Sequence, residues 1–352
     1  MHRVMVHQAN YDNCRVAVDR AFDLFPLEIT GKKVLVKPNA LRASNPEQGI
    51  VTHHAVIRAI IEKLEESSPA EIIVGDNPGM MSYGANEKTF QQTGLMEAAK
   101  GHYRNIGSEA VEVDFAPKFL DRISVSRAVL EADVVISVPK FKTHGLTIIT
   151  GAIKNSYGII PGALKAKLHQ KTGEAVRFSE MLVEVFRLKV PDLCIVDAVL
   201  GMEGNGPASN DLRQIGQIMA SDNAVALDAT MARMMGLDPQ GLPFLEMARQ
   251  TGLGDYNADS IEIVGDLPIL SNFKLPPKAR TVPTGAGEFF ASRIRLRPRA
   301  DKELCTGCET CVEQCPVSAL SMVNDFPEVD PELCIACFCC QEMCPEMAIQ
   351  LR

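Results

Sequence analysis

The sequence contains no run of about 18 consecutive apolar residues, the length that a membrane-spanning helix needs. Its first residues, Met1–His7, also lack the apolar segment of a secretory signal peptide. With 46% hydrophobic and 23% charged residues, the 352-residue chain has enough apolar material for a sizeable core and is not expected to be disordered. We therefore expect a soluble, cytoplasmic protein with no membrane partner.

The sequence has no basic surplus either, since 36 basic residues face 44 acidic ones and the net charge is −8. All of that excess lies between Asp301 and Arg352, where ten acidic residues face two basic ones, whereas residues 1–300 are neutral. Without an excess of Lys and Arg to neutralise phosphates, a nucleic-acid partner is not expected. The charge asymmetry instead indicates a separate C-terminal module.

Cysteine is nearly absent from the first 300 residues, which contain only Cys14 and Cys194. The other nine of the 11 cysteines lie within 305–344, where the pattern C-x2-C-x2-C-x3-C-P occurs twice. Three thiolates spaced in this way wrap one 4Fe–4S cluster, and the fourth, before proline, reaches the other cluster. The spacing therefore predicts two 4Fe–4S clusters, the first held by Cys305, Cys308, Cys311 and Cys344 and the second by Cys334, Cys337, Cys340 and Cys315.

Two alternatives explain this pattern less well. Zinc ribbons also use C-x2-C pairs, but they do not need three cysteines in succession followed by Cys-Pro, twice. A disulfide framework is not expected in a chain that lacks a secretory signal. Cys339 is surplus to the ligand count, and we interpret it as a buried or spare thiol rather than a ligand. Cys14 and Cys194 are expected to pack as small apolar residues.

The C-terminal module, residues 300–352, is thus predicted to be a small α+β electron carrier. Each cluster moves one electron, and the acidic shell should keep the potential low and could steer a basic redox partner. We expect a redox partner protein or another low-potential electron donor. Residues 273–299 are predicted to be a linker and a basic strand, whose arginines either protect a sheet edge or dock the acidic module.

Residues 1–272 alternate between apolar, β-rich runs and helical patterns, which predicts an α/β domain with a largely parallel sheet and flanking helices. The continuous apolar run at 133–138 is typical of a strand covered on both faces. The expected strands are 33–37, 71–75, 111–115, 133–138, 193–197 and 261–264, and the expected helices are 52–66, beginning at a capping Thr52, 87–102, 175–189 and 224–235. The strand order cannot be derived from the sequence.

Polar, glycine-rich segments follow several of these strands, at the edge where open α/β sheets bind ligands. One such loop is ordinary, but several of them with lysines and histidines favour a shared site. Our catalytic candidates are His144, Lys140 and Tyr157, as proton donors or as groups that hold a substrate anion. The candidates for substrate binding are Lys37, Asn39, Asp76, Lys142, Lys154, Asn155, His169, Glu203 and Asn205. The sequence has neither a P-loop nor G-x-G-x-x-G after a strand, so nothing supports a nicotinamide site.

The segments 139–144 (PKFKTH), 150–158 (TGAIKNSYG) and 201–207 (GMEGNGP), together with the cysteine repeat, resemble the domain of unknown function 362 family fused to a bacterial two-cluster ferredoxin. The resemblance covers nearly the whole chain and implies an iron–sulfur protein without an agreed reaction. A more distant similarity to the catalytic half of nickel-pincer lactate racemases rests on fold-level analogy alone.

Three hypotheses for the function follow. The first is a ferredoxin-dependent reductase that passes electrons to a small anionic substrate, or to a further cofactor or metal of unknown identity, at the strand ends of the α/β domain. The second is a non-catalytic electron carrier or redox sensor that docks on a partner protein. The third is a racemase- or isomerase-like enzyme with a metal at His144 or His169.

Overall fold

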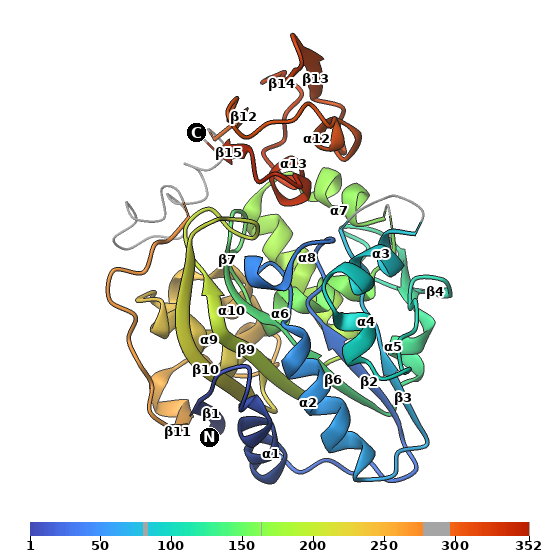
Figure 1. Cartoon of the computed structure of the whole chain (residues 1–352), viewed down its shortest axis with the longest axis vertical. Helices are drawn as coiled ribbons and strands as arrows, with labels where there is room; N and C mark the ends of the chain where they lie inside the picture. The colour runs from blue at the N-terminus through green and yellow to red at the C-terminus, as the bar shows by residue number, and fades with distance from the viewer. Residues whose placement is uncertain (80–83, 163, 277–295, 352) are drawn as a thin grey trace.

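The computed structural model describes residues 1–79, 84–162, 164–276 and 296–351. A large α/β part comprises residues up to 276, and a small C-terminal part with short strands and helices lies over one edge of its sheet (Figure 1). Most of the predicted linker, and residues 293–295 of the predicted basic strand, fall outside the described residues. In the described part of the chain, no helix is long and apolar enough to cross a membrane.

The α/β part is built on one mixed, mostly parallel sheet, which confirms the predicted fold class. Strands β11–β1, β9–β6, β6–β2, β2–β3 and β7–β9 pair in parallel, whereas β1–β10, β10–β9 and β7–β8 are antiparallel. The order across the sheet is β11 (Ile261–Gly265), β1 (His2–Gln8), β10 (Leu212–Ser221), β9 (Leu193–Met202), β6 (Val134–Val138), β2 (Lys33–Pro38) and β3 (Glu71–Val74), with β7 (Lys140–His144) joined to β9 and β8 (Ile148–Thr150) joined to β7.

Each face of the sheet carries its own apolar core because successive side chains of a strand point to opposite faces. In β2, Val34 and Val36 pack in the core that contains α1 (Cys14–Leu24) and α2 (His54–Glu65). Leu35 packs in the other core, which is covered by α8 (Ala175–Leu188), α9 (Ala224–Met234) and α10 (Pro243–Gln250). The buried, apolar central strands therefore follow from helices that cover both faces (Figure 1).

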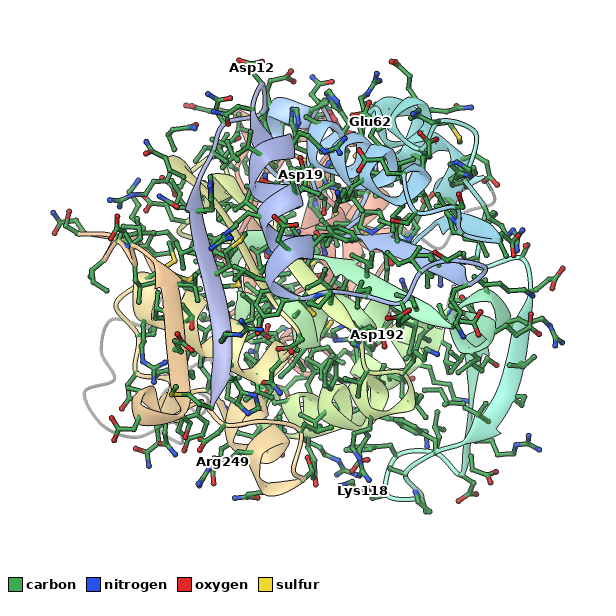
Figure 2. The ribbon with its side chains drawn as sticks, turned by 90° about the horizontal axis from the view of Figure 1, so that it is seen from below. Asp12, Asp19, Glu62, Lys118, Asp192 and Arg249 are labelled. Carbon is green, nitrogen blue, oxygen red and sulfur yellow. The ribbon has the colours of Figure 1, made fainter. Side chains whose placement is uncertain are left out.

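Surface side chains at the end opposite the C-terminal part carry charges of both signs (Figure 2). Asp19 lies on α1 and Glu62 on α2, while Lys118 and Arg249 lie on the other side of this view. This mixture agrees with the neutral balance of residues 1–300.

Three local expectations differ from the structure. The helix expected at 87–102 is split at Gly94, which has φ 74°, into α3 (Ala85–Gln92) and α4 (Leu95–Ala98). The strand expected at 111–115 is β4 (Ala110–Asp114), which pairs with β5 (Arg122–Ser126) in a separate hairpin and is half-exposed along its length. Helix α2 is capped by the ring of His53, which accepts from Ala55 N, because the hydroxyl of the expected cap Thr52 donates to Val138 O.

Several elements were not expected from the sequence. They include β1, β5, β7, β8 and β10, together with α1, α5 (Arg127–Glu131), α6 (Ala152–Asn155), α7 (Leu164–Thr172) and α10. In the C-terminal part, helices α12 (Thr310–Glu313) and α13 (Cys339–Met343) accompany two strand pairs, β12 (Pro298–Ala300) with β15 (Ile349–Leu351) and β13 (Leu320–Val323) with β14 (Phe326–Val329). The described end of the predicted basic strand therefore pairs with β15 along one side.

The sequence repeat of the C-terminal part is also a repeat of backbone shape. Glu309 before α12 and Phe338 before α13 occupy equivalent positions and have φ 60° and 64°. Non-glycine residues rarely adopt this left-handed conformation, so its recurrence indicates that both cysteine loops must turn in the same tight way.

Candidate functional site

The structure places the eight predicted cluster ligands around two separate hollows. One hollow is lined by Cys305, Cys308, Cys311 and Cys344, and the other by Cys315, Cys334, Cys337 and Cys340. These are the two sets that the spacing predicts, including the exchange of the fourth cysteine between the repeats. Cys339 lines neither hollow.

The donor groups fit two clusters better than two single ions. In the described part of the chain, no three His, Cys, Asp or Glu side chains converge as one metal ion requires. Four thiols that surround a hollow suit a larger group, whose separate irons each take one thiolate. In both repeats a backbone N–H also donates to the last cysteine, from Ala319 to Cys315 Sγ at 3.2 Å and from Ala348 to Cys344 Sγ at 3.3 Å, so the two loops hold this sulfur in the same way.

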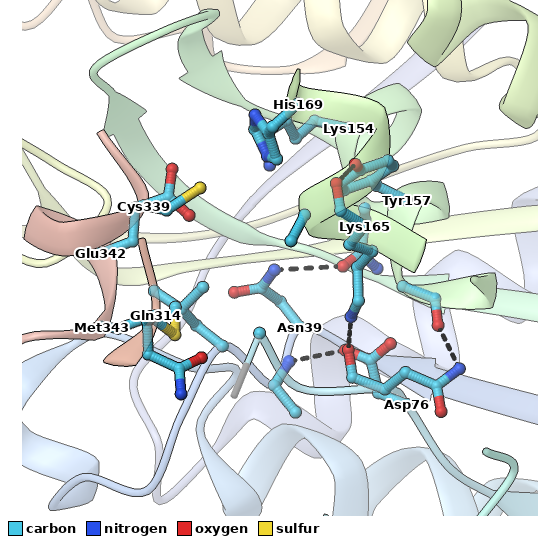
Figure 3. Close-up of a pocket in the computed structure, with 17 residues that line it drawn as sticks. Asn39, Asp76, Lys154, Tyr157, Lys165, His169, Gln314, Cys339, Glu342 and Met343 are labelled. Atoms are coloured by element: carbon cyan, nitrogen blue, oxygen red, sulfur yellow. Dashed lines mark hydrogen bonds between the residues drawn. The ribbon is translucent and has the colours of Figure 1, made fainter. Parts of the chain in front are cut away.

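A third cavity, of about 90 Å³, lies between the α/β part and the C-terminal part (Figure 3). We call it the interdomain cavity. The α/β part contributes Asn39, Ala40, Leu41, Asp76, Asn77, Gly79, Lys154, Asn155, Tyr157, Gly158, Lys165, Ala166 and His169, and the C-terminal part contributes Gln314, Cys339, Glu342 and Met343. Helix α13, which carries the predicted ligand Cys340, thus forms one wall.

Six of the predicted site residues line this cavity. They are Asn39, Asp76, Lys154, Asn155, Tyr157 and His169. They converge because β2 and β3 end at the same edge of the sheet, and because α6 (Ala152–Asn155) and α7 lie above that edge. The structure therefore brings these six residues together at one edge of the sheet, and their role as a shared site stays a prediction.

Lys154 is held in the cavity by the start of its own short helix. Asp228, from α9, accepts from Ala152 N at 2.6 Å and from Ile153 N at 3.0 Å. A Cβ on Gly151 would lie only 2.2 Å from Asp228 Oδ1, so glycine is required at that position. Burial raises the pKa of Asp228 to about 7, although the two N–H donors oppose this shift.

Two ammonium groups face the cavity. Lys154 has no ion-pair or hydrogen-bond partner among the described residues, and its Nζ lies 5.6 Å from the ring centre of Tyr157. Lys165 donates to two backbone oxygens, those of Asn77 and Pro78. Burial lowers the pKa of both lysines, and that of Lys165 falls to about 7.

The two rings at the cavity are placed by α7 and α8. His169 stacks on Phe178 with ring centres 4.4 Å apart, and its Nδ1 is buried without a partner among the described residues. Burial lowers the pKa of His169 to about 4, so the ring is neutral at neutral pH. The Tyr157 hydroxyl donates to Lys165 O at 2.8 Å, and burial raises its pKa well above the ordinary value.

Beneath the cavity lies a buried ion pair. Lys37 Nζ is 2.7 Å from Asp76 Oδ1, and Asp76 Oδ2 accepts from Ala40 N at 2.8 Å. A Cβ on Gly158 would lie 2.0 Å from Asp76 Oδ1, so this glycine lets the 150–158 segment pass close to the pair. Asn155 Oδ1 accepts from Asn39 Nδ2 at 3.2 Å, which joins the same segment to the end of β2.

The other predicted site residues do not line the interdomain cavity in the described structure. Lys140 Nζ is 2.7 Å from Asp197 Oδ2, with both side chains fully buried, and it donates to the Tyr11 hydroxyl. Lys142 donates to Ile50 O at 2.6 Å. Glu203 Oε2 lies 3.4 Å from Arg213 Nη1. Lys37 pairs with Asp76, which lines the cavity, but is not itself among the lining residues.

His144 and Asn205 serve instead as contacts between the two parts. His144 Nδ1 accepts from Leu146 N and Thr147 N, so its proton lies on Nε2, which is 2.9 Å from Glu342 Oε1. Burial lowers the pKa of His144 to about 3, and the contact is therefore made by a neutral ring. Gln341 donates to the backbone oxygen of Asn205.

Sequence reasoning missed Lys165 and Glu342 at this site, and it interpreted Cys339 only as a buried or spare thiol. Lys165 had a signal, since it lies with Lys167 and Lys171 in the lysine-rich segment around the predicted residue His169. Glu342 had none, because its segment was interpreted only as part of the cluster-binding repeat. Burial raises the pKa of Glu342, but His144 and Lys154 lower it more strongly, to about 2, so the carboxylate is charged.

Two family models match separate stretches of this chain. The family model described as "Domain of unknown function (DUF362)" matches residues 34–233, and a 4Fe–4S dicluster domain matches residues 297–345. The chain belongs to the DUF362 family. It carries a C-terminal dicluster domain, which implies two 4Fe–4S clusters and a role in electron transfer.

A thylakoid-associated protein of Synechocystis sp. is 31% identical over 277 residues, which cover 75% of this chain and 83% of that protein. Two solved structures are more remote. A protein from Thermotoga maritima has a TM-score of 0.41 at 12% identity and covers 68% of this chain. The lactate racemase apoprotein of Thermoanaerobacterium thermosaccharolyticum has a TM-score of 0.43 at 8% identity and covers 66%. This chain spans only 59% and 56% of those two chains, and neither likeness bears on its function.

Proposed function

We propose that this DUF362 protein is an iron–sulfur reductase, in which a small anionic substrate binds in the interdomain cavity and is reduced with electrons from the dicluster domain. One observation carries the proposal. The cavity has one wall of lysines and a histidine from the α/β part and one wall from α13, the helix that carries the predicted cluster ligand Cys340. A molecule bound there touches both the polar site and the redox domain.

The charges around the cavity favour an anion. Lys154 and Lys165 face it, and among the described residues of its lining the only carboxylates are Asp76 and Glu342. Asp76 is already paired with Lys37, so the two positive charges of Lys154 and Lys165 are opposed by the one negative charge of Glu342. A single negative charge on a ligand would balance this set, and its carboxylate or phosphate oxygens would accept from Lys154.

The size of the cavity favours a small molecule. One water molecule needs about 15 Å³ of cavity volume. A cavity of about 90 Å³ therefore accommodates on the order of six non-hydrogen atoms. That suits a carboxylate of about three carbons or an inorganic oxyanion. A nucleotide or a flavin is far larger than this space.

Proton supply is the second role of the site residues. The clusters, when bound, would supply electrons one at a time. Reduction of a carbonyl group to a hydroxyl consumes two electrons and two protons, so the site must also supply protons. Lys165 faces the cavity with a pKa of about 7, which suits proton transfer at neutral pH better than Tyr157 does. The structure thus favours Lys165 over the predicted donors His144 and Tyr157, and Lys154 over Lys140 and Lys142 as the anion ligand.

The electron donor in this proposal is a low-potential redox protein that docks on the dicluster domain. Cys308, one of the predicted ligands, is exposed, and the acidic residues Glu309 and Glu346, which line the same hollow, are exposed as well. A basic partner surface would complement them. The cytoplasmic location and the lack of nucleic-acid and membrane partners remain predictions.

The test is reoxidation of the reduced protein. The holoprotein is reduced under anaerobic conditions and mixed with a panel of short carboxylates, with and without an adjacent carbonyl, and with inorganic phosphate. The visible absorbance of the clusters then reports electron loss. We expect at least one carboxylate with an adjacent carbonyl, which takes up two electrons and two protons to become a hydroxyl, to reoxidise wild type, and Lys154→Met to lose this reaction.

The control is Lys171→Met, which also replaces one lysine by methionine, because Lys171 is exposed and is not among the residues that line the cavity. This variant should react like wild type. If no small molecule reoxidises the clusters while a basic redox protein does, the protein is the non-catalytic electron carrier instead. Equal rates in wild type and Lys154→Met would also refute the assigned site.

A further inference from the structure

Arg42 is a buried arginine that reaches from the α/β part toward the C-terminal part. It follows the end of β2 and is 3% exposed. Its Nε donates to Glu342 O at 3.2 Å and its Nη1 to Ala43 O at 3.2 Å. Its Nη2 is buried and has no hydrogen-bond partner among the described residues. Two backbone oxygens therefore accept hydrogen bonds from Nε and Nη1, and Nη2 is the guanidinium nitrogen whose N–H groups have no acceptor among the described residues.

A buried guanidinium needs a counter-charge, because a lone charge in a protein interior is strongly unfavourable. Burial lowers the pKa of Arg42, and the two groups that oppose this are Cys344 and Glu346, neither of which is hydrogen-bonded to it. Cys344 is one of the four thiols around the first hollow. Glu346 is exposed and also lines that hollow, so water screens its charge.

The neighbouring residues fix Arg42 at this place. Leu41 and Met347 pack against the same apolar cluster, which contains Ile50 and Met202. The segment that carries Arg42 and the segment that follows Cys344 are therefore held side by side. The position of the guanidinium is set by packing between the two parts rather than by an ion pair on the surface.

We propose that Arg42 is a positioning residue for the first cluster, whose negative charge balances the guanidinium and accepts a hydrogen bond from its free Nη2. Reduction adds one electron from an external donor to that cluster and breaks no bond. A fixed positive charge favours the more negative, reduced form. Arg42 thus raises the reduction potential of the cluster held by Cys305, Cys308, Cys311 and Cys344. The inference needs the dicluster domain but not the proposed reductase function.

The experiment is an anaerobic redox titration of the full-length holoprotein, followed by electron paramagnetic resonance. Arg42→Met should lower the midpoint potential of one cluster and leave the other nearly unchanged. The loss of one charge-assisted contact corresponds to about a tenfold or larger drop in the reduction equilibrium constant at a fixed solution potential. Arg42→Lys, which keeps the charge, should retain most of the wild-type potential.

Two further variants separate the explanations. Glu346→Gln removes the exposed acid and should change neither potential by a comparable amount; a shift as large as that of Arg42→Met would show that Glu346 is the counter-ion. The charge of Arg297 interacts with Cys334, which lines the other hollow. Arg297→Met should therefore lower the midpoint potential of the other cluster. If it shifts the same cluster as Arg42→Met, the assignment of Arg42 to the first cluster is wrong.

Iron content keeps the proposal testable if a variant is unstable. Loss of iron from Arg42→Met but not from Arg42→Lys would support a requirement for positive charge at the cluster. Equal iron loss in both variants would contradict it, because the charge would then not be the property that matters. Full iron content in Arg42→Met with both midpoint potentials unchanged would also overturn the proposal.

Discussion

Replacement of Asp228 tests how the fold presents Lys154 to the cavity. The carboxylate accepts two backbone N–H groups at the start of α6, and Asp228 is fully buried. Asp228→Ala would leave both donors without an acceptor, at about 1–3 kcal/mol each, so we expect unfolding to require about 2–6 kcal/mol less. Asp228→Asn keeps one acceptor oxygen, so the decrease in its free energy of unfolding should be about half as large.

The same residue predicts a pH dependence. In the folded protein the pKa of Asp228 is raised from 3.8 to about 7. Between these two pH values the folded protein binds a proton that the unfolded chain does not, so this group's contribution to stability falls as pH rises through that window. The full change is on the order of 4 kcal/mol, and it should be absent in Asp228→Asn.

The assay is anaerobic urea unfolding of the holoprotein at about pH 5 and about pH 8, for wild type and both variants. Wild type should gain less stability from pH 5 to pH 8 than Asp228→Asn does. The reasoning is refuted if Asp228→Ala unfolds at the wild-type urea concentration, or if wild type and Asp228→Asn respond to pH in the same way.

Three more predictions concern the ion pairs and the cavity. Lys140→Met leaves Asp197 buried and unpaired and should cost about 3–5 kcal/mol in urea unfolding, with a smaller loss in the double variant Lys140→Met/Asp197→Asn; equal losses would contradict this. Gly158→Ala would push into Asp76 beneath the cavity and should destabilise the protein by a similar amount, so a wild-type unfolding midpoint would argue against that contact. Carboxylate binding measured by calorimetry should weaken above pH 7, up to about tenfold per pH unit, because Lys165, with a pKa of about 7, loses its charge. Lys165→Arg should flatten that profile, and a profile unchanged by this variant would exclude Lys165 as its cause.

That pH profile depends on every charged group that faces Lys165. Asp76 and Glu342 raise its pKa, whereas Lys37 and Lys154 lower it, and burial is the largest effect. A bound anion would raise the pKa further, so the apparent midpoint in the presence of ligand should lie above that of the free protein.

The features that the sequence predicted best are those fixed by local spacing. The cysteine repeat alone divided the eight predicted ligands into the two sets that line the two hollows, because adjacent thiols in a tight loop must face the same group. The strands at 33–37, 71–75 and 133–138 were also found, since continuous apolar runs are expected only where helices cover both faces of a sheet.

The features that the sequence could not provide depend on which segments meet in space. Lys140 follows a strand as predicted, but its own strand β7 pairs with β9. This pairing places Asp197 beside the Lys140 ammonium, so Lys140 does not reach the cavity. Glu342 lies two residues from a predicted ligand, yet it faces His144 across the contact between the two parts. Strand order and domain docking decide such roles, and neither leaves a pattern in one sequence.

The central claim is that the interdomain cavity joins an anion site to the redox domain, and the reoxidation rate of the reduced holoprotein tests it most directly. The account predicts that a small carboxylate reoxidises the clusters of wild type and Lys171→Met, and that Lys154→Met loses this reaction while it keeps its iron. It is contradicted if Lys154→Met and wild type are reoxidised at the same rate, or if no anion in the panel accepts electrons from either protein.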